Sequence, residues 1–104
     1  MWWHCRYEAH DRISPAQLTE RFLRQHDAGS NAPSKIRGWY TFASGISGYV
    51  VFETDTLKEL TEIIAPFACL VTWRVESITE LHYTMFLEEA RQHHHQRSSE
   101  ITRV

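Results

Sequence analysis

Four short segments of the chain alternate apolar and polar side chains, and two helix-forming segments lie between them in a fixed order. The alternating segments are residues 2–9, 35–42, 48–54 and 70–77. Alternation at every second residue is the pattern of a β-strand with one buried and one open face. The order strand, helix, strand, strand, helix, strand predicts an α+β fold of the ferredoxin-like βαββαβ type. Both helices then cover one face of a four-stranded antiparallel sheet with the strand order 4-1-3-2.

Capping residues predict where the two helices begin. Ser14 stands directly before Pro15 and three residues before Gln17, which is the spacing of a capping box with proline at the first helical position. Thr56 stands in the same relation to Glu59. The first helix is therefore expected to follow residue 14, and the second to follow residue 56.

The length of the chain, 104 residues, is enough for one domain and not for two. We expect this domain to span residues 1–92 and to include a third helix from Tyr83 to Gln92. The polar residues 93–104 are expected to form a flexible tail.

The apolar runs and the cysteines bear on location. The longest apolar run, residues 65–71, is far shorter than the roughly 20 residues needed to cross a bilayer, so no membrane association is expected. Two cysteines are too few for a disulfide framework, which favours a reducing, cytoplasmic setting. Cys5 and Cys69 are offset along their strands, so both are expected to be buried free thiols.

Parity along the strands assigns each side chain to one face of the sheet. The face under the helices is expected to carry the apolar set Trp3, Cys5, Tyr7, Ile36, Tyr40, Phe42, Val50, Phe52, Val71, Trp73 and Val75. The open face then carries the complementary set His4, Arg6, Glu8, Arg37, Trp39, Thr41, Tyr49, Val51, Glu53, Thr72, Arg74 and Glu76. Large side chains on an uncovered sheet are costly to leave in water, which favours a homodimer formed through the two open faces. The alternative is a solvated face with ordinary cross-strand Arg–Glu pairs.

Several short stretches resemble a known family. Residues 38–45 read Gly-Trp-Tyr-Thr-Phe-Ala-Ser-Gly, and residues 48–55 read Gly-Tyr-Val-Val-Phe-Glu-Thr-Asp. With residues 66–67 and 87–90, they are similar to short uncharacterised bacterial proteins, which are domains of unknown function with the dimeric α/β-barrel form of the ferredoxin-like fold. The resemblance covers residues 3–91 and implies a dimeric barrel, but no established reaction. That family tends to carry Arg-Trp-His where this chain has residues 39–41, so no role of that histidine is carried over.

The expected open face supplies a candidate ligand site. Its members are His4, Arg6, Arg37, Trp39, Tyr49, Glu53 and Arg74. The arginines can hold an anion through charge-assisted hydrogen bonds. The sequence therefore predicts a dimeric α/β-barrel protein that binds a small anionic or aromatic ligand between the two sheets.

Two alternatives stay open, and whether the chain is an enzyme is left undecided. One is a non-catalytic homodimeric structural or interaction module. The other is a cofactor-independent oxygenase or isomerase, in which His4 beside a carboxylate moves protons near neutral pH. The chain's single asparagine, Asn31, is expected in a loop, so the Asn–His–Trp set of such oxygenases is not visible.

Charge and spacing argue against other partners. A net charge of −2 gives no support to charge-driven binding of nucleic acids. Residues 47–54 offer Tyr49 as a stacking ring but lack the second aromatic residue of an RNA-recognition motif. The consecutive His93, His94 and His95 point in different directions on a helix, and neither His-x-x-x-His nor Cys-x-x-Cys occurs. No metal site and no cofactor are therefore predicted.

Overall fold

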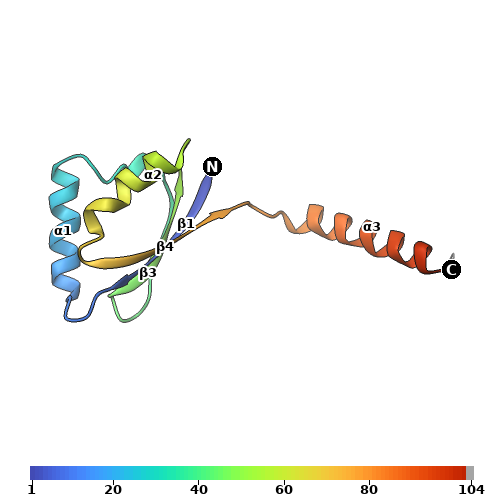
Figure 1. The fold of residues 1–104 in the computed structure, drawn as a ribbon, viewed down its shortest axis with the longest axis horizontal. Helices are drawn as coiled ribbons and strands as arrows, with labels where there is room; N and C mark the ends of the chain where they lie inside the picture. Colours follow the sequence, from blue (N-terminus) through green and yellow to red (C-terminus); the bar gives the residue numbers. More distant parts are fainter. Residues whose placement is uncertain (103–104) are drawn as a thin grey trace.

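The computed structural model describes the backbone of residues 1–102 and the side chains of residues 1–95. The strands form one antiparallel sheet in the order β2-β3-β1-β4, and the first two helices lie on one of its faces (Figure 1). This is the predicted ferredoxin-like fold with the predicted strand order. The elements are β1 (Trp2–Ala9), α1 (Pro15–Asp27), η1 (Pro33–Lys35), β2 (Ile36–Thr41), β3 (Ser47–Glu53), α2 (Leu57–Ile64), η2 (Ala65–Phe67), β4 (Val71–Ile78) and α3 (Tyr83–Thr102).

Both predicted caps fix the starts of the helices. The Ser14 hydroxyl accepts the backbone N–H of Gln17 at 3.2 Å, and the Gln17 side chain accepts the N–H of Ser14 at 2.8 Å. The Thr56 hydroxyl accepts the N–H of Glu59 at 3.1 Å, which satisfies one free donor of α2. α2 ends where η2 begins, and Pro66 lies within that 3-10 turn, because proline cannot continue the α-helical hydrogen bonds.

The core lies between the sheet and the two helices. In the central strands β1 and β3, buried side chains alternate with more exposed ones, and Cys5 lies opposite Val50. The predicted faces of these two strands are therefore confirmed. The buried apolar residues are Trp3, Cys5, Tyr7, Val50, Phe52, Leu60, Ile63 and Val71.

A β-bulge changes the parity of the edge strand β2. Its pairing with β3 shifts between Ile36 and Gly38, so that Ile36 lies opposite Phe52, whereas Trp39 lies opposite Val50. One extra residue in a strand turns every later side chain to the other face of the sheet. The second half of β2 is therefore inverted relative to the predicted pattern.

Side-chain contacts agree with this inversion. The Trp39 ring packs against Phe22 of α1, with 5.3 Å between the ring centroids. The Tyr40 ring stacks on Tyr49 at 5.1 Å on the opposite face of the sheet. The bulge thus places Trp39 and Thr41 on the helix side and Tyr40 and Phe42 on the open face. The parity prediction had each of these four residues on the other face, and it is wrong for all of them.

The C-terminal helix α3 begins at Tyr83 as predicted but runs to Thr102 instead of ending near Gln92. Residues 83–102 contain no glycine or proline and are rich in Glu, Gln and Arg, which favour helix. The residues expected to form a flexible tail are thus helical through residue 102, and residues 103–104 lie outside the described residues. The domain boundary at residue 92 stays a prediction. Figure 1 shows α3 projecting away from the sheet, and no helix within the described backbone has the length and apolar character needed to cross a membrane.

The two free cysteines differ in environment. Cys5 is completely buried in β1, as predicted, whereas Cys69 is exposed in the turn before β4, so the prediction of burial is wrong there. Burial raises the pKa of the Cys5 thiol from 9.0 to about 12, because the thiolate is poorly solvated in the core.

We therefore expect a small thiol reagent to label one cysteine in the native protein and two after denaturation. Below pH 9 the Cys5 thiol is neutral in both the folded and the unfolded state, so its contribution to the free energy of unfolding is constant there. Above pH 9 the thiol ionises in the unfolded state but stays neutral in the folded one. That contribution is lost as the pH rises from about 9 toward 12. Urea titrations of the wild type and Cys5→Ala at increasing pH measure this loss. Rapid labelling of Cys5 in the native protein would contradict the burial of its thiol.

Candidate functional site

The open face of the sheet holds the predicted site residues, with Trp39 as the exception. β1 contributes residues to its centre, and β3 and β4 flank β1 on either side. These positions have the opposite parity to the buried residues of the same strands. The site residues on this face are His4, Arg6, Arg37, Tyr49, Glu53 and Arg74.

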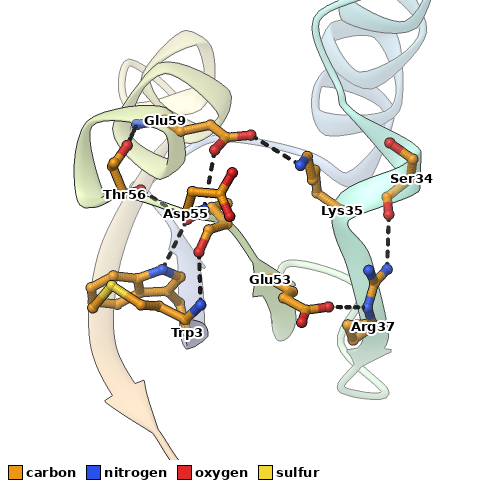
Figure 2. Close-up of polar contacts among 10 residues, drawn as sticks. Trp3, Ser34, Lys35, Arg37, Glu53, Asp55, Thr56 and Glu59 are labelled. Carbon is orange, nitrogen blue, oxygen red and sulfur yellow. Dashed lines mark hydrogen bonds and ion pairs between the residues drawn. The ribbon is translucent and has the colours of Figure 1, made fainter.

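Arg37 and Glu53 pair with each other at one end of the sheet. Arg37 Nε donates to Glu53 Oε2 at 2.7 Å, and Arg37 Nη1 donates to the backbone oxygen of Ser34 at 2.8 Å (Figure 2). The hydrogen bond from Arg37, and then one from Trp2, lower the pKa of the Glu53 carboxyl. Both partners are substantially exposed, so the pair adds little to stability. These two side chains join β2 to β3. Their charges already pair with each other, so they are not free to bind a ligand.

Removing the guanidinium is expected to return the pKa of Glu53 toward its ordinary value in Arg37→Ala. A carboxyl-detected NMR titration measures this pKa directly. The lowered pKa in the wild type also means that the small stabilisation by this pair is present above the ordinary carboxyl pKa and is lost as the pH falls through the folded-state value. Lys35→Ala, which removes the 3.4 Å ion pair to Glu59 nearby (Figure 2), is the control and should leave the Glu53 pKa unchanged. An unchanged Glu53 pKa in Arg37→Ala would contradict this assignment.

Arg6 and Arg74 carry unpaired positive charge on this face. They lie directly opposite each other on β1 and β4, an arrangement in which like charges repel. Neither makes an ion pair with any side chain that the structure describes. With Glu8 and Thr72 they line a small polar hollow of about 130 Å³. An anion between the two guanidinium groups would therefore relieve their repulsion.

A row of rings crosses the sheet beside these arginines. The His4 ring stacks on Tyr49, with 4.7 Å between ring centroids, and Tyr49 stacks on Tyr40. The Arg6 guanidinium lies 5.7 Å from the centroid of the Phe42 ring, a cation–π distance. Tyr40 is 59% exposed and Phe42 45% exposed, so this face presents aromatic surface to water. Sequence parity missed both of these residues, and the glycine in the middle of the strand was the available signal for a bulge.

Trp39 lines a different space, on the helix side of the sheet. Its Nε1 donates to the Tyr7 hydroxyl at 3.1 Å. A cavity of about 240 Å³ lies beside it, and Asn31 also lines this cavity. Because His4 lies on the opposite face of the sheet, the structure does not bring an Asn–His–Trp set together.

Metal-ligating side chains are dispersed. Among the residues with described side chains, no three His, Cys, Asp or Glu gather in a way that would hold a metal ion. His93, His94 and His95 are consecutive in α3, where neighbouring side chains diverge by about 100°. The described part of the chain therefore offers no donor set from which metal chemistry can be derived.

Comparison with known proteins gives one finding. A family model described as a domain of unknown function, DUF3303, matches residues 1–92. No curated protein matches the chain. The matched segment contains all four strands, α1, α2 and the first half of α3, and with them the open face and the helix-side cavity.

Proposed function

The chain belongs to the DUF3303 family of domains of unknown function, so its function has to be inferred from the site, and we propose that it is a homodimeric small-ligand-binding protein. Two copies pair through their open sheet faces and hold a small aromatic carboxylate between them. The observation that carries this proposal is the Arg6–Arg74 pair on the open face, next to a row of stacked rings.

Exposed rings and mixed charges favour a second copy as the cover of this face. Burying the Tyr40 and Phe42 rings removes apolar area from water, at about 25 cal/mol per Å². In a two-fold interface the same patch occurs on both partners. The face carries Glu8 and Glu76 as well as its arginines, so opposite charges can meet across such an interface.

The contacts of Arg6 indicate the class of ligand. Arg6 lies opposite Arg74 on one side and opposite Tyr49 on the other. Two guanidinium groups offer paired N–H donors that match a carboxylate. The His4–Tyr49 stack beside them offers a flat surface to a planar ring. A small aromatic carboxylate fits both features, and the function proposed is binding rather than a reaction.

A non-catalytic homodimeric module is the second candidate. The observation that favours it is the pair formed by Arg37 and Glu53, in which the charges of this face already satisfy each other. If Arg6 and Arg74 are paired in the same way with acidic residues of a second copy, the interior has no place for a ligand.

Sedimentation velocity and a benzoate titration test the proposal. The wild type is expected to sediment as a dimer at micromolar concentration and to bind benzoate but not the neutral benzamide. Arg6→Ala is expected to weaken both the dimer and benzoate binding, and His4→Ala to weaken benzoate binding more than the dimer. Arg91→Ala, on the exposed surface of α3, is the matched control and should change neither.

Three results separate the candidates. A 12.3 kDa monomer as the single species would overturn the pairing of the sheets. A dimer that binds no benzoate, and that Arg6→Ala dissociates, would favour the interaction module. Benzoate binding that survives both Arg6→Ala and His4→Ala would show that the open face is not the ligand site.

A further inference from the structure

A cavity lies between the helices and the sheet. The cavity there measures about 240 Å³ and is bounded by α1, α2 and the inner face of the strands. No residue of α1 is fully buried, so this helix stands off the sheet instead of filling the space. An apolar cavity of roughly 150 Å³ is enough to bind benzene. The present cavity has room for a molecule of two fused rings.

The wall of the cavity is apolar and carries no charged side chain. Aromatic rings come from both sides of it, among them Phe22 of α1 and Trp39 and Trp73 of the sheet. An ion would lose its hydration here without gaining an opposite charge. The wall therefore favours a neutral aromatic molecule, unlike the open face with its arginines.

Several lining residues carry polar groups, and two of them, Tyr7 and Asn31, are nine-tenths buried. The Tyr7 hydroxyl accepts the indole N–H of Trp39, and its own proton has no acceptor among the described residues. The Asn31 amide nitrogen donates to the backbone oxygen of Phe22 at 3.1 Å, whereas its carbonyl oxygen has no donor among the described residues. The Trp73 indole N–H is also buried without a partner among the described residues. Unused donors on Tyr7 and Trp73 and an unused acceptor on Asn31 within an apolar surround are the usual make-up of a small-molecule site.

We propose that this cavity binds a neutral bicyclic aromatic molecule carrying one hydroxyl group. The rings fill the space between α1 and the sheet and contact Phe22 and Trp39. The ligand hydroxyl accepts a hydrogen bond from the Tyr7 hydroxyl. This site lies on the other side of the sheet from the proposed carboxylate site, so each proposal stands or fails without the other.

Isothermal titration calorimetry with 2-naphthol as the probe tests the site. Its anionic counterpart, 2-naphthoate, is compared with it in Arg6→Ala, in which the proposed carboxylate site on the open face is weakened. We expect one 2-naphthol per chain and at least tenfold weaker binding of 2-naphthoate. Tyr7→Phe keeps the ring but removes the hydroxyl, and it is expected to weaken 2-naphthol binding about three- to tenfold. Tyr40→Phe makes the same change on the open face and is expected to leave the affinity unchanged.

A second variant fills the cavity from the helix side. Leu18 of α1 lines the cavity, and Leu18→Trp is expected to weaken 2-naphthol binding at least tenfold while the circular dichroism spectrum stays native. Arg6→Ala is expected to leave 2-naphthol binding unchanged, which separates this site from the open face. The proposal is overturned if 2-naphthol does not bind saturably, if 2-naphthoate binds equally well, or if a folded Leu18→Trp binds as the wild type does. If Leu18→Trp does not fold, the comparison of Tyr7→Phe with Tyr40→Phe decides, and equal affinities in these two variants overturn the proposal.

Discussion

Leu60→Ala is expected to lower the free energy of unfolding by about 3 kcal/mol. Leu60 is the centre of the apolar face of α2 and is completely buried against the sheet. Truncation removes three buried carbon atoms and leaves a void that the packed neighbours fill only in part. Domains of this size have about 5–15 kcal/mol of total stability, so the loss is a large fraction of it.

Urea unfolding followed by tryptophan fluorescence measures this loss. The matched control is Leu57→Ala, one turn earlier on α2, where the side chain is 54% exposed. Its expected effect is within about 0.5 kcal/mol, as for other surface substitutions. Equal losses in the two variants would mean that α2 does not pack through the face assigned to it.

Gly48→Ala is the second substitution with a large expected effect, a loss of about 3 kcal/mol. An added Cβ would lie 2.6 Å from the Tyr7 hydroxyl oxygen and 2.9 Å from the Cα of Thr41, and it would also collide with the backbone oxygen of Tyr40. Two of these three contacts are with backbone, so relief requires moving β2 away from β3. The position therefore needs glycine for close approach and not for an unusual backbone angle.

Gly38→Ala is the control for this substitution. There the nearest atom to an added Cβ is a ring carbon of Tyr40 at 3.3 Å, which a small side-chain rotation relieves. The expected change is below about 1 kcal/mol in either direction. Thermal unfolding of both variants gives the comparison, and a Gly48→Ala protein as stable as Gly38→Ala would show that β2 and β3 are not packed this closely.

The sequence predicted the central strands well because their environment leaves little choice. Cys5 and Val50 lie opposite each other in strands that pair on both sides, so a shift by one residue would expose a whole row of apolar side chains. The helix starts were equally predictable, since Ser14 and Thr56 act through hydrogen bonds within their own first turns. Helix caps depend on a few neighbouring residues, and central strands are held by a partner on each side. Both can therefore be predicted from the sequence alone.

The edge strand could not be predicted in the same way. β2 pairs only with β3, so an extra residue disturbs one ladder and bulges outward at small cost. Nothing in the alternation of residues 35–42 distinguishes a continuous strand from a bulged one, apart from Gly38. For this reason, Trp39 was expected on the open face and lies instead in the cavity wall.

The candidate site was predictable to the extent that it rests on the central strands and β4. His4, Arg6, Tyr49 and Arg74 lie on the expected face, and their roles toward a ligand stay predictions. Parity could not predict which charged side chains of this face already pair with each other. The Arg37–Glu53 hydrogen bond depends on how far the Arg37 side chain reaches across the bulged edge of the sheet.

The bulge in β2 also sets how this protein would respond to insertions and deletions. Removing one residue at Gly38 would restore simple alternation, with Ile36 still opposite Phe52, Trp39 still opposite Val50 and Tyr40 still opposite Tyr49. The cavity wall and the open face would therefore both survive that single event. A bulge in an edge strand is thus a place where a lineage with this fold can gain or lose one residue while the linings of its two surfaces stay as they are.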